Sequence, residues 1–342
     1  MNLREAIAKI VNREHLTDLE MRAVFGEIMS GDASAAQIGA FLTALRMKGE
    51  TIDEIVGATR AMRERATFVD TGVDTANGVL MDIVGTGGDG SGSFNVSTCT
   101  SFVVAAAGVR VAKHGNRAVS SRCGAADVLE ALGVNLELAP DRVAACVAEI
   151  GIGFLFAPKL HRAMKHAIGP RREIGIRTIF NILGPLTNPA GANVQLTGVF
   201  TPALTRVIAQ VLMRLGMKRA IIVWGEGGLD EMTVTGATHM ADAHDGRVTE
   251  SVLLPEELGL KRATMADIRG GADAAASAAM VRAVLAGEAG PRLDMVLLNA
   301  GTALMAAGKA ADIREGMALA RELIQSGAAL GKLDALAAFA GA

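Results

Sequence analysis

Residues 79–98 read VLMDIVGTGGDGSGSFNVST, a short apolar run followed by a loop rich in glycine and hydroxyl side chains. The apolar run at 79–84 is typical of a buried strand. Residues 101–108 read SFVVAAAG, which predicts a helix that ends at Gly108. A glycine-rich loop between a strand and a helix N-terminus offers free backbone N–H groups and the positive end of the helix dipole. The stretch therefore predicts an α/β unit that binds a phosphate or pyrophosphate.

The loop does not fit the common phosphate-binding motifs well. A Walker loop needs a lysine, and none lies between Gly85 and Thr98. The letters from Gly85 to Gly90 do match G-x-G-x-x-G, so spacing alone leaves a dinucleotide site or a plain glycine turn open. Asp89 would face the pyrophosphate of a dinucleotide with no metal between them. A carboxylate beside a phosphate suggests a magnesium bridge instead.

The composition argues against several classes of protein. The chain has 342 residues, half of them hydrophobic, and a net charge of −2. We therefore expect no nucleic-acid partner and no anionic membrane, and the few aromatic residues offer no platform for stacking bases. Three scattered cysteines predict free thiols in a reducing compartment. No apolar run is long enough to span a membrane and the N-terminus is unlike a signal peptide, so we expect a cytoplasmic protein.

The first part of the chain is expected to be helical. Capping-box patterns occur at Thr17–Glu20, Ser34–Gln37 and Thr51–Glu54. Each of them precedes apolar residues at helical spacing, and Gly31 and Gly49 fall where helices would stop. We expect a small helical domain over residues 1–70, followed by a link at about 70–78.

Short strands alternate with helices in the rest of the chain. Strands are expected at residues 79–84, 109–113, 135–138, 154–156, 194–200 and 220–224. Helices are expected at 125–132, from about Pro140, and from Asp273 onward. This alternation predicts an α/β domain with a mainly parallel sheet over residues 75–342.

Three further polar stretches could bind ligands. Residues 113–127, KHGNRAVSSRCGAAD, leave a predicted strand and enter a helix, and ligands of open α/β sheets bind at such strand ends. In residues 225–231, GEGGLDE, two adjacent carboxylates suit a hard cation such as Mg²⁺. Residues 161–189 carry arginines that could hold a carboxylate in a bidentate contact. Taken singly, each stretch could also be an ordinary charged loop or helix face, and no nucleophile constellation emerges.

Taken together, these motifs resemble the anthranilate phosphoribosyltransferase family. GTGGDG, NVST, KHGNRAVSS, ADVLEALG, AMKH, RTIFNILGPLTNP and DE occur in the family's order and cover nearly the whole chain. The resemblance implies transfer of the phosphoribosyl group of phosphoribosyl pyrophosphate to the amino nitrogen of anthranilate, with release of pyrophosphate, in tryptophan biosynthesis. It also implies a nucleoside phosphorylase-like fold, a homodimer, and a segment at about 159–189 that returns to the helical domain.

The resemblance also implies roles for single residues. Those implied for phosphoribosyl pyrophosphate are Gly85, Gly88, Asp89, Ser93, Asn95, Val96, Ser97, Thr98, Lys113, His114, Gly115, Asn116, Arg117, Ala118, Val119, Ser120, Ser121 and Ala125. Those implied for anthranilate are Gly85, Asn116 and Arg171, with Arg171 facing the carboxylate. Those implied for Mg²⁺ are Ser97, Asp230 and Glu231. No general base is assigned, since His114 could equally be an orienting donor.

The chain departs from the usual family pattern at a few positions. Cys123 and Ala125 stand where the family commonly has serines, which could remove hydrogen bonds to phosphate, and Pro170 directly precedes Arg171. Two other functions are conceivable for such a chain. A pyrimidine nucleoside phosphorylase would need its own phosphate and base motifs. A non-catalytic nucleic-acid-binding relative would need a basic groove and eroded metal carboxylates.

Overall fold

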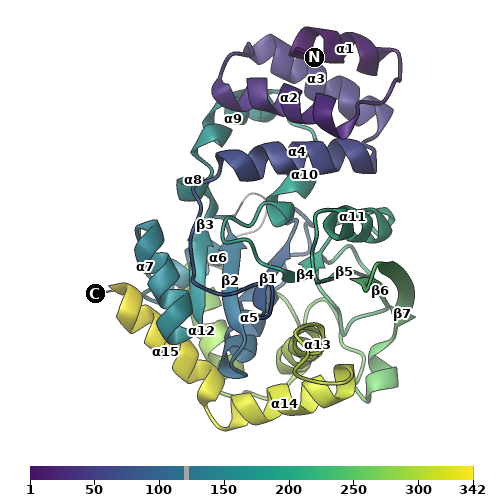
Figure 1. Cartoon of the computed structure of the whole chain (residues 1–342). Coiled ribbons are helices and arrows are strands. Elements are labelled where there is room, and N and C mark those ends of the chain that lie inside the picture. Colours follow the sequence, from purple (N-terminus) through teal and green to yellow (C-terminus); the bar gives the residue numbers. More distant parts are fainter. Residues whose placement is uncertain (119–122, 342) are drawn as a thin grey trace.

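The computed structural model describes residues 1–118 and 123–341, and it places a group of helices above a single sheet (Figure 1). The first four helices are α1 (Leu3–Val11), α2 (Asp18–Ser30), α3 (Ala35–Lys48) and α4 (Ile52–Arg65). The three predicted capping boxes are confirmed, because the side chains of Thr17, Ser34 and Thr51 each accept an N–H from the residue three positions on. Helices α2 and α3 end at Gly31 and Gly49, whose φ angles are 87° and 90°.

The second part of the chain contains a seven-stranded sheet in the order β3-β2-β1-β4-β5-β6-β7. Its strands are β1 (Leu80–Gly85), β2 (Arg110–Gly115), β3 (Ile152–Phe156), β4 (Val194–Gly198), β5 (Arg219–Gly225), β6 (Thr238–His244) and β7 (Arg247–Leu253). Strands β3, β2, β1, β4 and β5 are parallel, whereas β6 and β7 are antiparallel additions at one edge. The predicted mainly parallel sheet is confirmed.

The predicted strands were wrong at two places. Residues 135–138 form a turn, because Asn135 Oδ1 accepts the N–H of Glu137 at 2.8 Å and the chain then enters α7 (Pro140–Ala145). The β6–β7 hairpin is not among the elements expected from the sequence. Its turn residues, Asp245 and Gly246, have φ angles of 49° and 72°, and Asp-Gly is a strong signal for such a two-residue hairpin turn.

Helices cover both faces of the sheet. The longer ones are α5 (Val96–Ala106), α11 (Ala203–Arg214), α12 (Ala274–Leu285), α13 (Pro291–Ala306), α14 (Ile313–Gln325) and α15 (Ala328–Gly341). The shorter ones are α6 (Ala125–Ala131), α8 (Ala157–Leu160), α9 (Lys165–Ile174), α10 (Phe180–Leu183), η1 (Cys146–Ile150), η2 (Arg162–Met164), η3 (Gly184–Leu186) and η4 (Pro255–Leu258).

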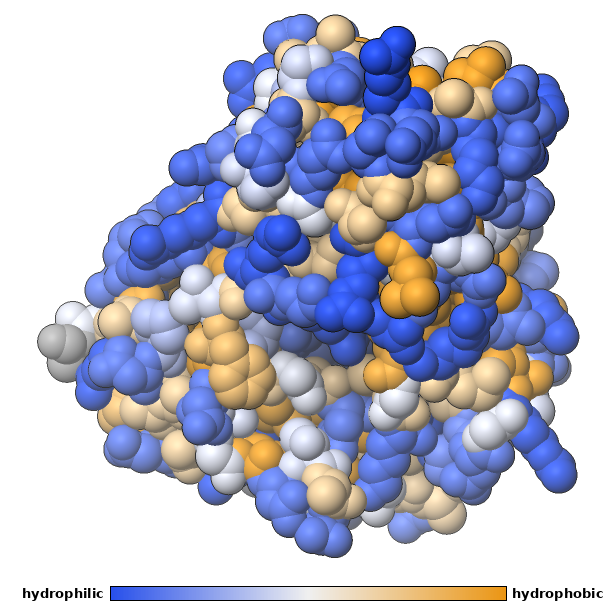
Figure 2. Space-filling model, turned by 45° about the horizontal axis from the view of Figure 1, so that its top comes forward, coloured by the Kyte–Doolittle hydropathy of each residue, from blue (hydrophilic) through white to orange (hydrophobic). Residues whose placement is uncertain are grey.

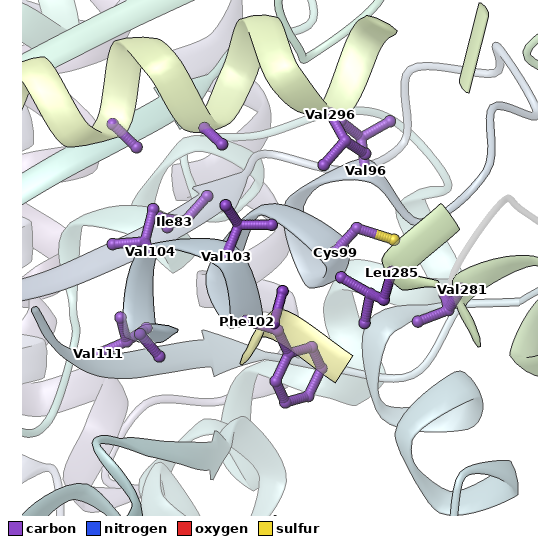
Figure 3. Packing of buried hydrophobic residues seen from close by; sticks show 14 of the residues in the cluster. Ile83, Val96, Cys99, Phe102, Val103, Val104, Val111, Val281, Leu285 and Val296 are labelled. Carbon is purple, nitrogen blue, oxygen red and sulfur yellow. The ribbon is translucent and has the colours of Figure 1, made fainter. Parts of the chain in front are cut away.

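Helix α5 lies in the middle of the larger hydrophobic core. Its apolar side chains pack against strands β1 and β2 and against helices α12 and α13 (Figure 3). The helix begins at Val96, five residues before the predicted start, so the sequence NVST includes its first turn. Because α5 is almost entirely buried, it holds the glycine-rich loop that precedes it against a rigid base.

The segment between β3 and β4 returns to the first four helices. Ala167 of α9 and Phe180 of α10 belong to the same buried cluster as Phe25 and Phe41, and the rings of Phe25 and Phe180 lie 5.4 Å apart between centroids. Helix α11 joins this cluster from the sheet side (Figure 1). The returning segment therefore connects the helices to the edge of the sheet where the polar loops lie.

Hydrophilic side chains cover most of the face shown in Figure 2, with hydrophobic ones in smaller patches. Within residues 1–118 and 123–341, no helix is both long enough and apolar enough to cross a membrane. Cys99, Cys123 and Cys146 are free thiols, as predicted.

Candidate active site

The carboxyl ends of β2, β1, β4 and β5 lie next to one another at one edge of the sheet. The glycine-rich loop leaves β1, the loop that begins at Asn116 leaves β2, and the segment that carries Asp230 and Glu231 leaves β5. Hydrogen bonds join Asp230 to Gly87 and Glu231 to Ser97, so loops far apart in the sequence meet here. The convergence expected from the sequence is thus present in the structure.

The loop after β1 depends on glycine for its shape. Gly87, Gly88, Gly90 and Gly92 have φ angles between 64° and 72°, a region that glycine enters without steric cost. Asp89 lies among them, where its Oδ1 accepts the N–H of Ser91 at 3.2 Å. The other oxygen of the Asp89 carboxylate is buried and has no hydrogen-bond partner within the described residues. An orphan carboxylate oxygen in a phosphate-type loop fits contact with a metal-bound ligand.

The N-terminus of α5 is open toward this loop. Asn95 precedes the helix without capping it, and its side-chain amide donates instead to the carbonyl of Cys123 at 3.3 Å. Ser93 donates its N–H to Ser91 Oγ at 3.2 Å, which tightens the loop just before the helix. Val96 is buried in the core, and Thr98 Oγ1 is a buried hydroxyl without a partner in the described part of the chain. This helix end can therefore receive an anion.

Three carboxyl groups crowd together beside the loop. Asp230 Oδ2 accepts the N–H of Gly87 at 2.7 Å, and Glu231 Oε1 accepts the N–H of Ser97 at 3.1 Å. Burial, together with the neighbouring charge of Asp89, raises the pKa of Asp230 to about 7. Burial and the charge of Asp230 raise the pKa of Glu231 to about 8. Such a cluster is unfavourable alone and becomes favourable beside a cation.

The cluster fits a magnesium ion that shares its ligands with a substrate. Within residues 1–118 and 123–341 no group of three or more His, Cys, Asp or Glu side chains is arranged to hold a metal alone. Mg²⁺ is commonly bound by one or two carboxylates together with phosphate oxygens of the substrate and water. Asp230, Glu231 and the Ser97 hydroxyl are the side chains that could supply the protein part of such a set.

Lys113 reaches from β2 beneath the loop. Its side chain is buried, and Nζ donates to the carbonyl of Ile83 at 2.6 Å and to Ser97 Oγ at 3.2 Å. Burial lowers the pKa of Lys113, whereas the charges of Asp82, Glu231 and Asp230 oppose that shift. Lys113 thus orients the Ser97 hydroxyl and places a positive charge behind the carboxylates.

His114 lies in a buried polar layer next to His161, with 5.1 Å between the ring centroids. Its backbone N–H donates to Asp82 Oδ1 at 3.0 Å, and Asn188 donates to Asp82 Oδ2 at 2.8 Å. Burial lowers the pKa of His114 to about 3, with His161 contributing. A neutral imidazole with so low a pKa is a weak base, so the geometry favours an orienting role for His114.

The loop after β2 is narrow where it leaves the strand. A Cβ atom on Gly115 would lie 2.8 Å from the Phe154 ring, so the position requires glycine. Asn116 Oδ1 accepts the N–H of Arg117 at 2.7 Å. Ala125 begins α6. Cys123 stands where a serine was expected, and its backbone carbonyl accepts the hydrogen bond from the Asn95 side chain.

Asp127 anchors both ends of this second loop. It accepts the N–H groups of Ala118 and Gly124, both at 2.9 Å. Arg117 forms ion pairs with Asp127 at 3.0 Å and Glu130 at 2.8 Å, so its side chain is turned toward α6. The expected phosphate-binding residues Val119, Ser120 and Ser121 lie outside the described residues.

Arg171 lies on α9, in the segment that returns to the helices. Its guanidinium carbon is 4.8 Å from the centroid of the Phe180 ring, and burial lowers its pKa. It forms no ion pair within the described part of the chain. A half-buried arginine without an acidic partner is suited to bind the carboxylate of a ligand.

Several residues that shape the site are not among those expected from the sequence. A Cβ atom on Gly198, at the end of β4, would lie 1.5 Å from the carbonyl oxygen of Asp230. A glycine inside a strand pattern can mark such a close backbone approach, so the sequence did carry a signal. Arg177 and Asn188 lie in sequence motifs, but no role was assigned to them or to Asp82. The contacts of Arg177 with Gly88 and of Asn188 with Asp82 join segments 89 and 106 positions apart.

Matches to known families agree with this architecture. Residues 4–66 match the helical bundle domain of the glycosyl transferase family, and residues 77–330 match its a/b domain. Fold and matches together define a two-domain glycosyl transferase.

Similar proteins narrow that class. The anthranilate phosphoribosyltransferase of Desulfotalea psychrophila is 67% identical over 339 residues, which cover 99% of this chain and 97% of the relative. The crystal structure of the Thermus thermophilus anthranilate phosphoribosyltransferase is 45% identical, with a TM-score of 0.92 over 98% of this chain and 99% of that one. The Saccharomyces cerevisiae enzyme in complex with PRPP and Mg is 28% identical, with a TM-score of 0.88 over 99% and 97%. This chain belongs to the anthranilate phosphoribosyltransferase family.

Proposed function

We propose that the chain transfers the phosphoribosyl group of phosphoribosyl pyrophosphate to the amino nitrogen of anthranilate and releases pyrophosphate, a step of tryptophan biosynthesis. The observation that carries the proposal is the meeting of a glycine-rich loop, an open helix N-terminus and a carboxylate cluster at neighbouring strand ends. Family membership supports the identity of the two substrates.

The loop and the carboxylates are assigned to the leaving group. The backbone N–H groups of the loop and the α5 N-terminus would stabilise the negative charge that gathers on pyrophosphate. Ser97, Asp230 and Glu231 would hold Mg²⁺, which, when bound, supplies Lewis-acid stabilisation of the phosphate oxygens. Lys113 keeps Ser97 in place through the hydrogen bond to its hydroxyl.

The acceptor is assigned to the side of the returning segment. Arg171 would bind the anthranilate carboxylate, and Gly85 and Asn116 would line the rest of its pocket. The amine nitrogen forms a bond to C1 of the ribose, the bond from C1 to the pyrophosphate oxygen breaks, and the amine then loses a proton to solvent. Because an aromatic amine is a competent nucleophile once aligned, orientation can supply much of the acceleration.

A fluorescence assay tests this function. Anthranilate consumption should require both phosphoribosyl pyrophosphate and Mg²⁺, and no consumption in the complete mixture would remove the proposal. Salt-sensitive binding of single-stranded DNA, measured by filter binding, would instead favour the non-catalytic rival.

Arg171→Ala is expected to raise KM for anthranilate by about tenfold or more, because a charged hydrogen-bonded contact is lost. KM for phosphoribosyl pyrophosphate should change much less. Steady-state kinetics with each substrate varied in turn make the comparison. Equal changes in both constants would contradict the carboxylate role.

In the presence of phosphoribosyl pyrophosphate, Mg²⁺ is expected to raise the melting temperature more at about pH 8 than at about pH 6. The pKa values of Asp230 and Glu231 are raised to about 7 and about 8, so at the lower pH the metal must displace protons from both carboxyls. Thermal melts with and without Mg²⁺ measure the shift. An equal shift at both pH values, at constant ionic strength, would place the metal elsewhere.

We also propose a cytoplasmic homodimer joined through the helical domain, taken as residues 1–70 with about 159–189. Free thiols and the exposed apolar side chains of Val11, Leu19 and Met47 on that domain support the proposal. Light scattering that gives the mass of a single chain would contradict the dimer.

A further inference from the structure

We propose that Arg177 is a positioning residue that holds the phosphate-binding loop from the returning segment, an inference that rests on the proposed function. Arg177 lies in the connection between α9 and α10, just after Gly175 ends α9. Its Nη2 donates to the carbonyl oxygen of Gly88 in the loop after β1. Its guanidinium carbon is 4.3 Å from the centroid of the Phe200 ring, just beyond β4.

The arrangement fixes the guanidinium from two directions. The Phe200 ring supports its flat face, and one edge N–H points at the loop carbonyl. The backbone beside Arg177 is itself held, because Thr178 donates its N–H to Asn181 Oδ1 at 2.9 Å. A planar fork on an aromatic ring suits arginine, whereas a lysine ammonium would lack the stacked plane.

The loop needs external support of this kind. Gly87, Gly88, Gly90 and Gly92 give it wide conformational freedom, which must be restricted before a pyrophosphate can be bound. Other hydrogen bonds to it come from the sheet part of the chain, at Asp230 and Gly270. Arg177 adds a bond from the segment that returns from the helices.

The position of the bond indicates which substrate it serves. Gly88 lies between Gly87, whose N–H binds Asp230, and Asp89, which carries the unpartnered carboxylate oxygen. Fixing the Gly88 carbonyl therefore sets the direction of the groups assigned to the pyrophosphate and its metal. Arg171, assigned to anthranilate, lies over Phe180 instead. We therefore expect Arg177 to act on phosphoribosyl pyrophosphate, separately from Arg171.

Kinetics of three variants test this role. Arg177→Ala should raise KM for phosphoribosyl pyrophosphate by about tenfold, the effect of losing one charged hydrogen bond, with KM for anthranilate within about twofold of wild type. Arg177→Lys should recover little of the loss. Arg172→Ala is the matched control, since this exposed arginine of α9 has no hydrogen bond or ion pair in the described chain and removes the same charge.

The outcomes are separable. Unchanged KM for phosphoribosyl pyrophosphate in Arg177→Ala overturns the inference, and so does full recovery in Arg177→Lys, which would indicate a direct charge contact with phosphate. If Arg177→Ala does not fold, Phe200→Leu should still give part of the effect, and no effect there overturns the inference. A wild-type chain without activity would remove the proposed function; calorimetric titration with phosphoribosyl pyrophosphate and Mg²⁺ would then still compare the variants.

Discussion

Replacing Asp230 with asparagine is expected to lower kcat/KM by about 10²- to 10³-fold, while the metal-free protein stays at least as stable as the wild type above about pH 7. The activity loss follows from the site. Asp230 is one of two adjacent carboxylates assigned to Mg²⁺, and a metal clamp on a leaving pyrophosphate supplies several kcal/mol. The asparagine oxygen could still accept the N–H of Gly87, so the loop should keep its shape.

The same substitution is expected to favour the folded state of the metal-free protein. The pKa of Asp230 in the folded chain is raised to about 7 from an ordinary value of 3.8, so the folded state binds more protons than the unfolded state between these values. Stability therefore falls as pH rises through this window. Asparagine removes that loss and relieves repulsion on Glu231, whose pKa is raised partly by Asp230. The advantage of the variant should grow from about pH 5 to about pH 8.

Kinetics with varied Mg²⁺ and thermal melts of metal-free protein measure the two effects. Asp245→Asn is the matched control, because it makes the same change in an exposed hairpin turn and should leave both unchanged. An Asp230→Asn enzyme with an unaltered Mg²⁺ titration would count against the metal assignment. A variant less stable than wild type at high pH would instead mean that Asp230 is mainly structural.

Local signals in the sequence were sufficient for much of the fold. The capping boxes at Thr17, Ser34 and Thr51 fixed three helix starts, because a cap involves only residues three positions apart. Apolar runs located five strands, since strands buried on both faces read as continuous hydrophobic segments. The strand predicted at residues 135–138 was wrong because so short an apolar-polar stretch fits a turn as well as a strand. The hydrogen bond from the Glu137 N–H to Asn135 Oδ1 stabilises the turn.

Site residues were predictable only where they belong to a sequence motif whose chemical role can be inferred from its residue types. Asp89, Asp230 and Glu231 follow predicted strands, and residues at the carboxyl ends of neighbouring parallel strands meet. The contact of Arg177 with Gly88 could not be read this way, because it depends on a segment that leaves the sheet and comes back. The role of His114 also stayed open, since the burial that lowers its pKa and its contact with His161 arise only in the folded chain.

Gly198→Ala is expected to lower kcat/KM by about 100-fold or more, although Gly198 has no side chain that could contact a substrate or Mg²⁺. A Cβ atom there would lie 1.5 Å from the carbonyl oxygen and 2.1 Å from the carbonyl carbon of Asp230. Contacts under 3.0 Å do not occur at real Cβ atoms, so one backbone must move by more than an ångström. Displacements of about 1 Å at a positioned group can cost about 10²-fold in rate.

Asp230 is the partner that must move. Gly198 ends β4, which pairs with β1 on one side and β5 on the other, and its carbonyl accepts the N–H of Thr86 at 3.0 Å. Asp230 lies in a loop and has fewer constraints. The overpacking should also destabilise the fold by about 1–3 kcal/mol, so activity is compared at a temperature where both proteins are folded.

The control for this substitution is Gly331→Ala in α15, where an added Cβ meets nothing within 4 Å. It should leave kinetics unchanged and raise stability by about 0.5–1 kcal/mol, because alanine is the better residue inside a helix. If the displacement of Asp230 causes the activity loss, Gly198→Ala must also weaken the response to Mg²⁺, as Asp230→Asn does. A stable Gly198→Ala enzyme with a normal Mg²⁺ titration would show that the carboxylate tolerates the shift, and that the close approach of β4 to Asp230 serves packing alone.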